Sequence, residues 1–115
     1  LLLTEPLCEL PVRERIFREC IDLYGQIDGT NSVILIKPHP RDLLDYEDRF
    51  SEYIVLDRKF PMEVLNFIEG LIFRRVISVF TVVRNIRFAE EIVYLGEDFM
   101  DKYEDPKLHR QNEEI

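Results

Sequence analysis

The segment that decides the fold reads Ser32-Val33-Ile34-Leu35-Ile36-Lys37-Pro38-His39-Pro40-Arg41-Asp42. Its first half is a run of branched apolar residues, which is typical of a buried β-strand. The run stops at Pro38, because proline lacks the N–H group that sheet pairing requires. We expect the two prolines to hold Lys37, His39 and Arg41 in a stiff, extended tip at the carboxyl end of this strand. Ligands bind at that edge in open α/β sheets, and three cationic side chains there favour a phosphate.

Length and charge limit the classes of function. The chain has 115 residues, which fits one domain with one core, and it begins at Leu1 without a methionine, so we expect a piece of a longer protein. Its net charge of −8 argues against general nucleic-acid binding, which needs a basic face. Cys8 and Cys20 fit small core residues in a reducing compartment. No apolar run is long enough for a membrane span or a signal peptide, so a cytoplasmic location is expected by default.

Apolar patterns along the chain predict strands that alternate with helices. Helical spacing follows Pro11 as far as Gly25, and a second helix with a buried stripe of Val64, Leu65, Phe67 and Ile68 is expected between Phe60 and Gly70. Asp42 is placed to cap a short helical turn, and Arg13 falls on the solvent side of the first helix. The expected strands are Leu1 to Pro6, Ser32 to Ile36, Tyr53 to Leu56, Val76 to Phe80 and Ile92 to Leu95.

Strands separated by helices read as βαβ units. The fold class predicted is therefore α/β, a Rossmann-like parallel sheet with helices on both faces, over residues 1–115 as a single domain. Residues 97–115 form a polar, acidic tail. No Gly-x-Gly-x-x-Gly fingerprint or Walker sequence follows any strand. The carboxyl ends of parallel strands lie along one edge, so polar groups after different strands can converge on one ligand.

Four groups near these strand ends can contact a phosphorylated ligand. His39 can donate a hydrogen bond or a proton to a phosphate oxygen, and Lys37 offers a compact positive charge. Glu63, on a first helical turn, can accept hydrogen bonds from ribose hydroxyls, or it can simply favour the helix dipole. Thr81 can supply a hydroxyl and backbone N–H groups to a phosphate, or serve only as an N-cap. His39 also has a structural alternative, a hydrogen bond to a loop carbonyl.

Two motifs resemble the nucleotide-binding half of bacterial sialyltransferases, and most closely glycosyltransferase family 52, the lipooligosaccharide and capsule sialyltransferases. They are Ile-Lys-Pro-His-Pro-Arg-Asp at residues 36–42 and Val-Leu-Asp-Arg-Lys-Phe-Pro-Met-Glu-Val-Leu at residues 55–65. The resemblance implies the carboxyl-terminal, CMP-sugar-binding half of a two-domain GT-B enzyme. It further implies a catalytic role for His39, which would contact the donor phosphate and assist departure of CMP, with Pro40 as its partner.

The resemblance also implies a set of nucleotide-binding residues. Glu63 matches the glutamate on the ribose hydroxyls. Where the family has adjacent hydroxyl residues on the phosphate, this chain has Ser78 and Thr81, separated by Val79 and Phe80. The nucleotide-binding set is then Lys37, Pro40, Glu63, Ser78 and Thr81, and no metal or other cofactor is expected.

The implied function is transfer of sialic acid from CMP-sialic acid to a bacterial cell-surface glycan. The acceptor would be held by an amino-terminal domain that this chain lacks, so the isolated chain is expected to be inactive. A homodimer and a peripheral location at the inner membrane are compatible with this scheme. Two alternatives stay open: a transferase that uses another CDP- or CMP-linked donor in envelope polymer synthesis, and a non-catalytic interaction domain with the same fold.

Overall fold

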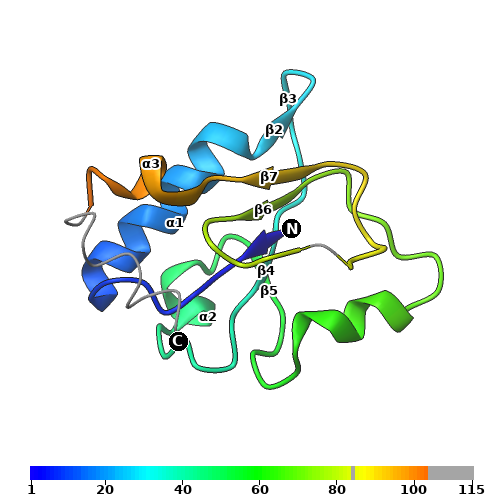
Figure 1. Cartoon of the computed structure of the whole chain (residues 1–115), viewed down its shortest axis with the longest axis horizontal. Coiled ribbons are helices and arrows are strands. Elements are labelled where there is room, and N and C mark those ends of the chain that lie inside the picture. The colour runs from blue at the N-terminus through cyan, green and yellow to red at the C-terminus, as the bar shows by residue number, and fades with distance from the viewer. Residues whose placement is uncertain (84, 104–115) are drawn as a thin grey trace.

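A five-stranded parallel sheet forms the centre of the molecule, in a computed structural model that describes residues 1–83 and 85–103 (Figure 1). The strand order is β5-β4-β1-β6-β7, and every neighbouring pair is parallel. Leu2 pairs with Ile36 on one side and with Ile77 on the other. The strands are β1 (Leu2–Leu3), β4 (Leu35–Lys37), β5 (Ile54–Val55), β6 (Val76–Ser78) and β7 (Ile92–Tyr94). The predicted α/β, Rossmann-like fold class is confirmed.

Within residues 1–83 and 85–103, four helical segments and one hairpin accompany the sheet (Figure 1). The longest helix ends at Gly25, where an added Cβ would lie only 2.5 Å from the Ile21 carbonyl oxygen, so the close approach requires glycine. The hairpin turns at Asp28 and Gly29, both with positive φ, at the predicted turn. The elements are α1 (Leu10–Tyr24), β2 (Gln26–Ile27), β3 (Thr30–Asn31), α2 (Tyr46–Arg49), η1 (Met62–Phe67) and α3 (Gly96–Met100).

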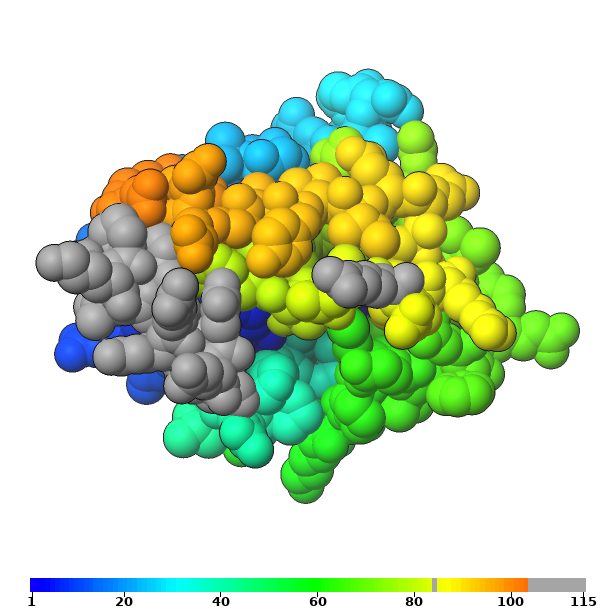
Figure 2. All heavy atoms as spheres, in the orientation of Figure 1, coloured from blue at the N-terminus to red at the C-terminus, as the bar shows by residue number. Residues whose placement is uncertain are grey.

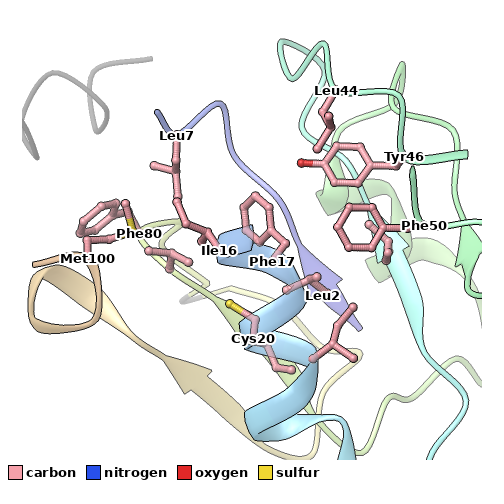
Figure 3. Packing of buried hydrophobic residues seen from close by; sticks show 14 residues of the cluster. Leu2, Leu7, Ile16, Phe17, Cys20, Leu44, Tyr46, Phe50, Phe80 and Met100 are labelled. Carbon is pink, nitrogen blue, oxygen red and sulfur yellow. The ribbon is translucent and has the colours of Figure 1, made fainter. Parts of the chain in front are cut away.

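Side chains alternate between the two faces of the sheet and build two apolar clusters. Leu2, Ile36 and Ile77 belong to the cluster on the face covered by α1, α2 and α3. Figure 3 shows Leu2 in this cluster together with Phe17 and Cys20 of α1. Leu3 and Val76 point to the opposite face, which η1 covers through Leu65. Helical segments therefore cover both faces of the sheet, as the fold class requires. Cys20 is fully buried in the first cluster, as predicted for a small core residue.

The expected buried stripe between Phe60 and Gly70 is confirmed at Leu65 and wrong at the other three positions. The segment forms a 3₁₀-helix of six residues, Met62–Phe67, in which residues three apart share a face. Met62 and Leu65 therefore turn toward the sheet, whereas Val64, Phe67 and Ile68 are 41%, 87% and 50% exposed. This segment forms the lower right of the surface in Figure 2.

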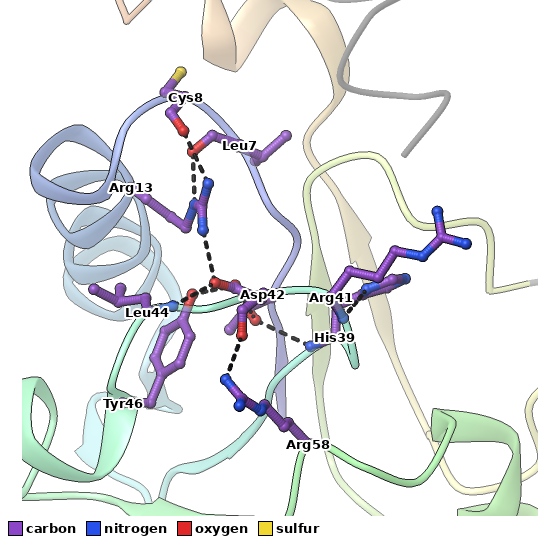
Figure 4. Close-up of polar contacts among 10 residues, drawn as sticks. Leu7, Cys8, Arg13, His39, Arg41, Asp42, Leu44, Tyr46 and Arg58 are labelled. Carbon is purple, nitrogen blue, oxygen red and sulfur yellow. Dashed lines mark hydrogen bonds and ion pairs between the residues drawn. The ribbon is translucent and has the colours of Figure 1, made fainter.

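A buried polar network corrects two further expectations (Figure 4). Arg13 lies in the interior, where its guanidinium donates to the Asp42 carboxylate over 2.8 Å. Asp42 is fully buried and does not cap the helix that follows. That cap is Asp45, which accepts from the Asp48 N–H over 3.2 Å. Periodicity assigns an arginine to the solvent side, but here a buried carboxylate compensates its charge.

The polar tail is only partly described. Residues 97–103 contain most of α3 and the segment after it, and Met100 of this helix is fully buried against the first cluster. Residues 104–115 of the predicted tail lie outside the described residues.

We expect Asp42→Ala to lower the free energy of unfolding by about 3–5 kcal/mol, because it leaves the Arg13 guanidinium buried without its counter-charge. Arg74→Ala is the matched control, since it breaks an ion pair with Asp28 in which both side chains are mostly exposed. Urea denaturation of the two variants measures the difference. An Asp42→Ala protein as stable as the control would contradict a structural role for the buried pair.

Candidate functional site

A cavity of about 210 Å³ lies at the carboxyl edge of the sheet, where β1 and β6 are neighbours. After β1 the chain builds β4 and β5 on one side, and then crosses to build β6 and β7 on the other. Such a reversal of strand order opens a crevice, which is where α/β sheets bind ligands. A larger hollow of about 760 Å³ beside α2 and β5 contains none of the six predicted site residues.

Five of the six predicted site residues line this switch-point pocket. One is the last residue of β4, two come from the segment after it, one comes from the first turn of η1, and one follows β6. They are Lys37, His39, Pro40, Glu63 and Thr81. The sixth, Ser78, is fully buried, and its hydroxyl donates to the Thr81 carbonyl over 2.8 Å. Ser78 therefore shapes the turn after β6 and does not line the pocket.

His39 sits in a turn and not in the extended tip that the two prolines suggested. The Asp42 N–H donates to the His39 carbonyl over 2.9 Å, which closes a β-turn with Pro40 at its second position. Proline favours that position because its fixed φ matches the turn. The turn aims the Arg41 N–H at the His39 ring, where it donates to Nδ1 over 3.0 Å (Figure 4).

This contact decides which proton the His39 ring carries. Since Nδ1 accepts a hydrogen bond, the neutral ring holds its proton on Nε2, and Nε2–H is the donor that can meet a ligand. Burial lowers the pKa of His39, and the nearby Arg41 charge lowers it further. At neutral pH the ring is therefore suited to donate a hydrogen bond, and proton transfer would first require Nδ1 to give up its bond to Arg41.

Lys37 is 2% exposed, and its charge is directed into the protein. The ammonium donates to the Pro38 carbonyl and, over 3.4 Å, to the Arg58 carbonyl, and it lies 4.5 Å from the centre of the Phe60 ring. Burial lowers its pKa, while the charges of Asp57 and Glu63 oppose that shift. The Lys37 ammonium therefore stabilises the backbone around the pocket through its hydrogen bonds to two carbonyls, and it is poorly placed to act as a point charge on a ligand.

Thr81 meets an internal carboxylate that the sequence analysis missed. Glu5 Oε1 accepts from the Phe80 N–H over 2.9 Å, and from both the N–H and the hydroxyl of Thr81. Glu5 is 7% exposed, so its charge is buried with these three donors. The stretch from Thr81 to Val83 is not helical, so Thr81 is not the N-cap that the alternative reading predicted. The sequence does contain a signal for this buried carboxylate, because Glu5 is the charged residue of a mostly apolar predicted strand and directly precedes Pro6.

Glu63 is exposed on the first turn of η1 and lines the same pocket as His39. Burial lowers the pKa values of Lys37 and His39, and the negative charge of Glu63 is close enough to oppose part of that lowering in both. Within residues 1–83 and 85–103, no cluster of three or more histidine, cysteine, aspartate or glutamate side chains is placed to hold a metal ion. In the same part of the chain, no helix is long and apolar enough to cross a membrane.

Comparison with known proteins finds a distant similarity. An uncharacterized protein of Haemophilus influenzae is 35% identical over 101 residues, which covers 84% of this chain. The chain spans only 31% of the length of that relative. No family model matches the sequence, and no solved structure matches the chain.

We expect NMR titration to give His39 a pKa below the ordinary value of about 6.5, because burial and Arg41 both disfavour the charged ring. Arg41→Gln should raise this pKa, and Arg87→Gln, an exposed control, should leave it unchanged. Since the folded state binds the proton more weakly, His39 should make the protein less stable as pH falls below about 6.5. A His39 pKa at or above the ordinary value would contradict the geometry described here.

Proposed function

We propose that the switch-point pocket binds the nucleotide of a CMP-sugar, and that the chain is the donor-binding domain of a sialyltransferase-like glycosyltransferase. The observation that carries the proposal is the meeting of His39 and Glu63 in one pocket, although 24 positions separate them in sequence. The two residues belong to the two motifs that resemble the sialyltransferases. Their pocket lies where an α/β sheet of this strand order binds ligands.

His39 and Glu63 have different roles in this proposal. Negative charge builds on the donor phosphate as its bond to the sugar breaks, and a hydrogen bond from His39 Nε2–H strengthens with that charge. Nδ1 is held by the Arg41 N–H, so the ring is oriented before the ligand arrives. Glu63 accepts hydrogen bonds from the ribose hydroxyls, which distinguishes a ribonucleotide from a deoxyribonucleotide.

The rest of the reaction requires groups that we place in a larger protein. One wall of a cleft can orient the donor, but a base for the acceptor hydroxyl must come from the opposite wall. The Haemophilus influenzae relative is about three times as long as the segment matched here, which is compatible with a second domain. Sialic acid as the sugar, and a bacterial surface glycan such as lipooligosaccharide or capsule as the acceptor, are parts of the proposal that rest on the resemblance.

Two specific observations favour a non-catalytic interaction domain as the second candidate. The Lys37 ammonium is bound to backbone carbonyls, and the Thr81 donors are bound to Glu5, so both are engaged within the protein. A transferase for another CDP- or CMP-linked donor would use the same His39 turn. Calorimetric titration with CMP, CDP and UMP separates these candidates, and a protein that binds none of the three would leave the non-catalytic one.

Substitutions of His39 test its contact with the phosphate. His39→Asn keeps an acceptor for the Arg41 N–H but loses the donor at the Nε2 position, so CMP binding should weaken by about 1–3 kcal/mol. His39→Gln places an amide N–H near the Nε2 position and should retain most of the affinity. Calorimetry measures both. Equal affinities for wild type and His39→Asn, with intact folding, would remove His39 from the binding site.

The ratio of CMP to deoxy-CMP affinity tests Glu63. Wild type should prefer CMP by about 1–3 kcal/mol, because the deoxy analogue leaves the carboxylate without one partner. Glu63→Gln should shrink this preference, whereas Glu69→Gln, an exposed control just beyond η1, should keep it. If wild type binds CMP and deoxy-CMP equally well, Glu63 does not contact the ribose.

A further inference from the structure

The turn after β6 is held in shape without Glu5. The Ser78 hydroxyl donates to the Thr81 carbonyl over 2.8 Å. From just beyond β7, the Leu95 N–H donates to the Ser78 carbonyl over 2.9 Å, and the Gly96 N–H at the start of α3 donates to the Val79 carbonyl over 2.8 Å. These bonds fix the backbone of residues 78–81 from the side of β7, so the turn keeps its form whatever occupies its other side.

On its other side the turn presents three donors to one point. They are the successive N–H groups of Phe80 and Thr81 and the Thr81 hydroxyl, and all three meet the same oxygen of Glu5. Successive backbone N–H groups in a turn form a concave site that suits an anion. Since Thr81 also lines the switch-point pocket, this anion nest borders the space where the ligand would bind.

Glu5 can leave the nest without disturbing the sheet. Its backbone lies just beyond β1, where the Leu7 N–H donates to the Glu5 carbonyl over 2.8 Å. That bond holds the main chain beside Pro6, so the Glu5 side chain can rotate about its own bonds while the main chain keeps its place. The exposed fraction of Glu5 is 7%, and release would expose its charge to the pocket and to water.

We propose that Glu5 is a built-in competitor for the anionic group of the ligand. Its carboxylate fills the nest of Phe80 and Thr81, and a phosphate enters this nest by displacing it. The inference rests on the proposed function in one respect, that the pocket receives a phosphate. Two anions cannot share the three donors, because like charges at that distance repel strongly. The affinity of the wild-type protein for phosphate is therefore lowered by its own side chain.

Calorimetric titration with inorganic phosphate tests the competition. Glu5→Gln keeps the size of the side chain and an oxygen that can accept hydrogen bonds, but it removes the negative charge. We expect this variant to bind phosphate about tenfold or more tightly than wild type. Glu69→Gln removes an equal charge outside the pocket and should match wild type. A folded Glu5→Gln protein that binds phosphate no more tightly than wild type would overturn the proposal.

Wild-type protein provides a second measurement in case Glu5→Gln does not fold. Displacement of the carboxylate changes the hydrogen-bond acceptor of two backbone amides, so phosphate titration should shift the NMR amide signals of Phe80 and Thr81. If the chemical shifts of both amides are unchanged at high phosphate concentration, the nest is not a ligand site and Glu5 has only a structural role in the turn.

The two proposals can fail separately. Tighter phosphate binding by Glu5→Gln, together with no binding of CMP by wild type or by the His39 variants, would retain the competitor and remove the CMP-sugar function. CMP binding that depends on His39, together with phosphate binding by Glu5→Gln that is no tighter than in wild type, would retain the CMP-sugar function and remove the competitor.

Discussion

The buried ion pair between Arg13 and Asp42 is the contact on which the arrangement of the pocket depends. A charge in the interior is tolerated only when it is paired and when its other hydrogen-bonding positions are filled. Asp42 meets this condition by also accepting from the Thr4 hydroxyl, the Leu44 N–H and the Tyr46 hydroxyl. The guanidinium of Arg13 also donates to the carbonyls of Leu7 and Cys8. The start of α1, the end of β1 and the loop after β4 are thereby joined at one point.

This network reaches the proposed ligand site through Thr4. The Thr4 hydroxyl donates to Asp42 over 2.8 Å, and its oxygen accepts from the His39 N–H over 3.3 Å. The His39–Asp42 turn is therefore fixed at both ends, by Thr4 at its first residue and by the ion pair at its last. A site that must hold a phosphate in one orientation benefits from such support, because the imidazole then needs little reorganisation when the ligand binds.

The charges around the pocket are arranged in two groups. Lys37 and Glu5 are buried and hydrogen-bonded to backbone groups, so they stabilise the main chain that surrounds the pocket. His39 is half-buried and Glu63 is exposed, and these two can meet a ligand directly. The distinction changes how the strand-end cluster is understood. A row of cationic residues in sequence suggested a strongly positive tip, but burial turns one of these charges inward and favours the neutral form of a second.

The parallel α/β architecture can be predicted from the sequence alone, because strands of branched residues alternating with helices have few other ways to bury both faces. It also identified the strand ends that meet at one pocket, since parallel strands place their carboxyl ends along one edge. The positions of Arg13 and Glu5, in contrast, depend on tertiary packing. Helical spacing assigns Arg13 to the solvent, and the strand pattern assigns no partner to Glu5, whereas each of the two meets partners more than 25 positions away in the chain. The exposure of Val64 and Phe67 was likewise a tertiary outcome, because a 3₁₀-helix formed where helical spacing predicted an α-helix.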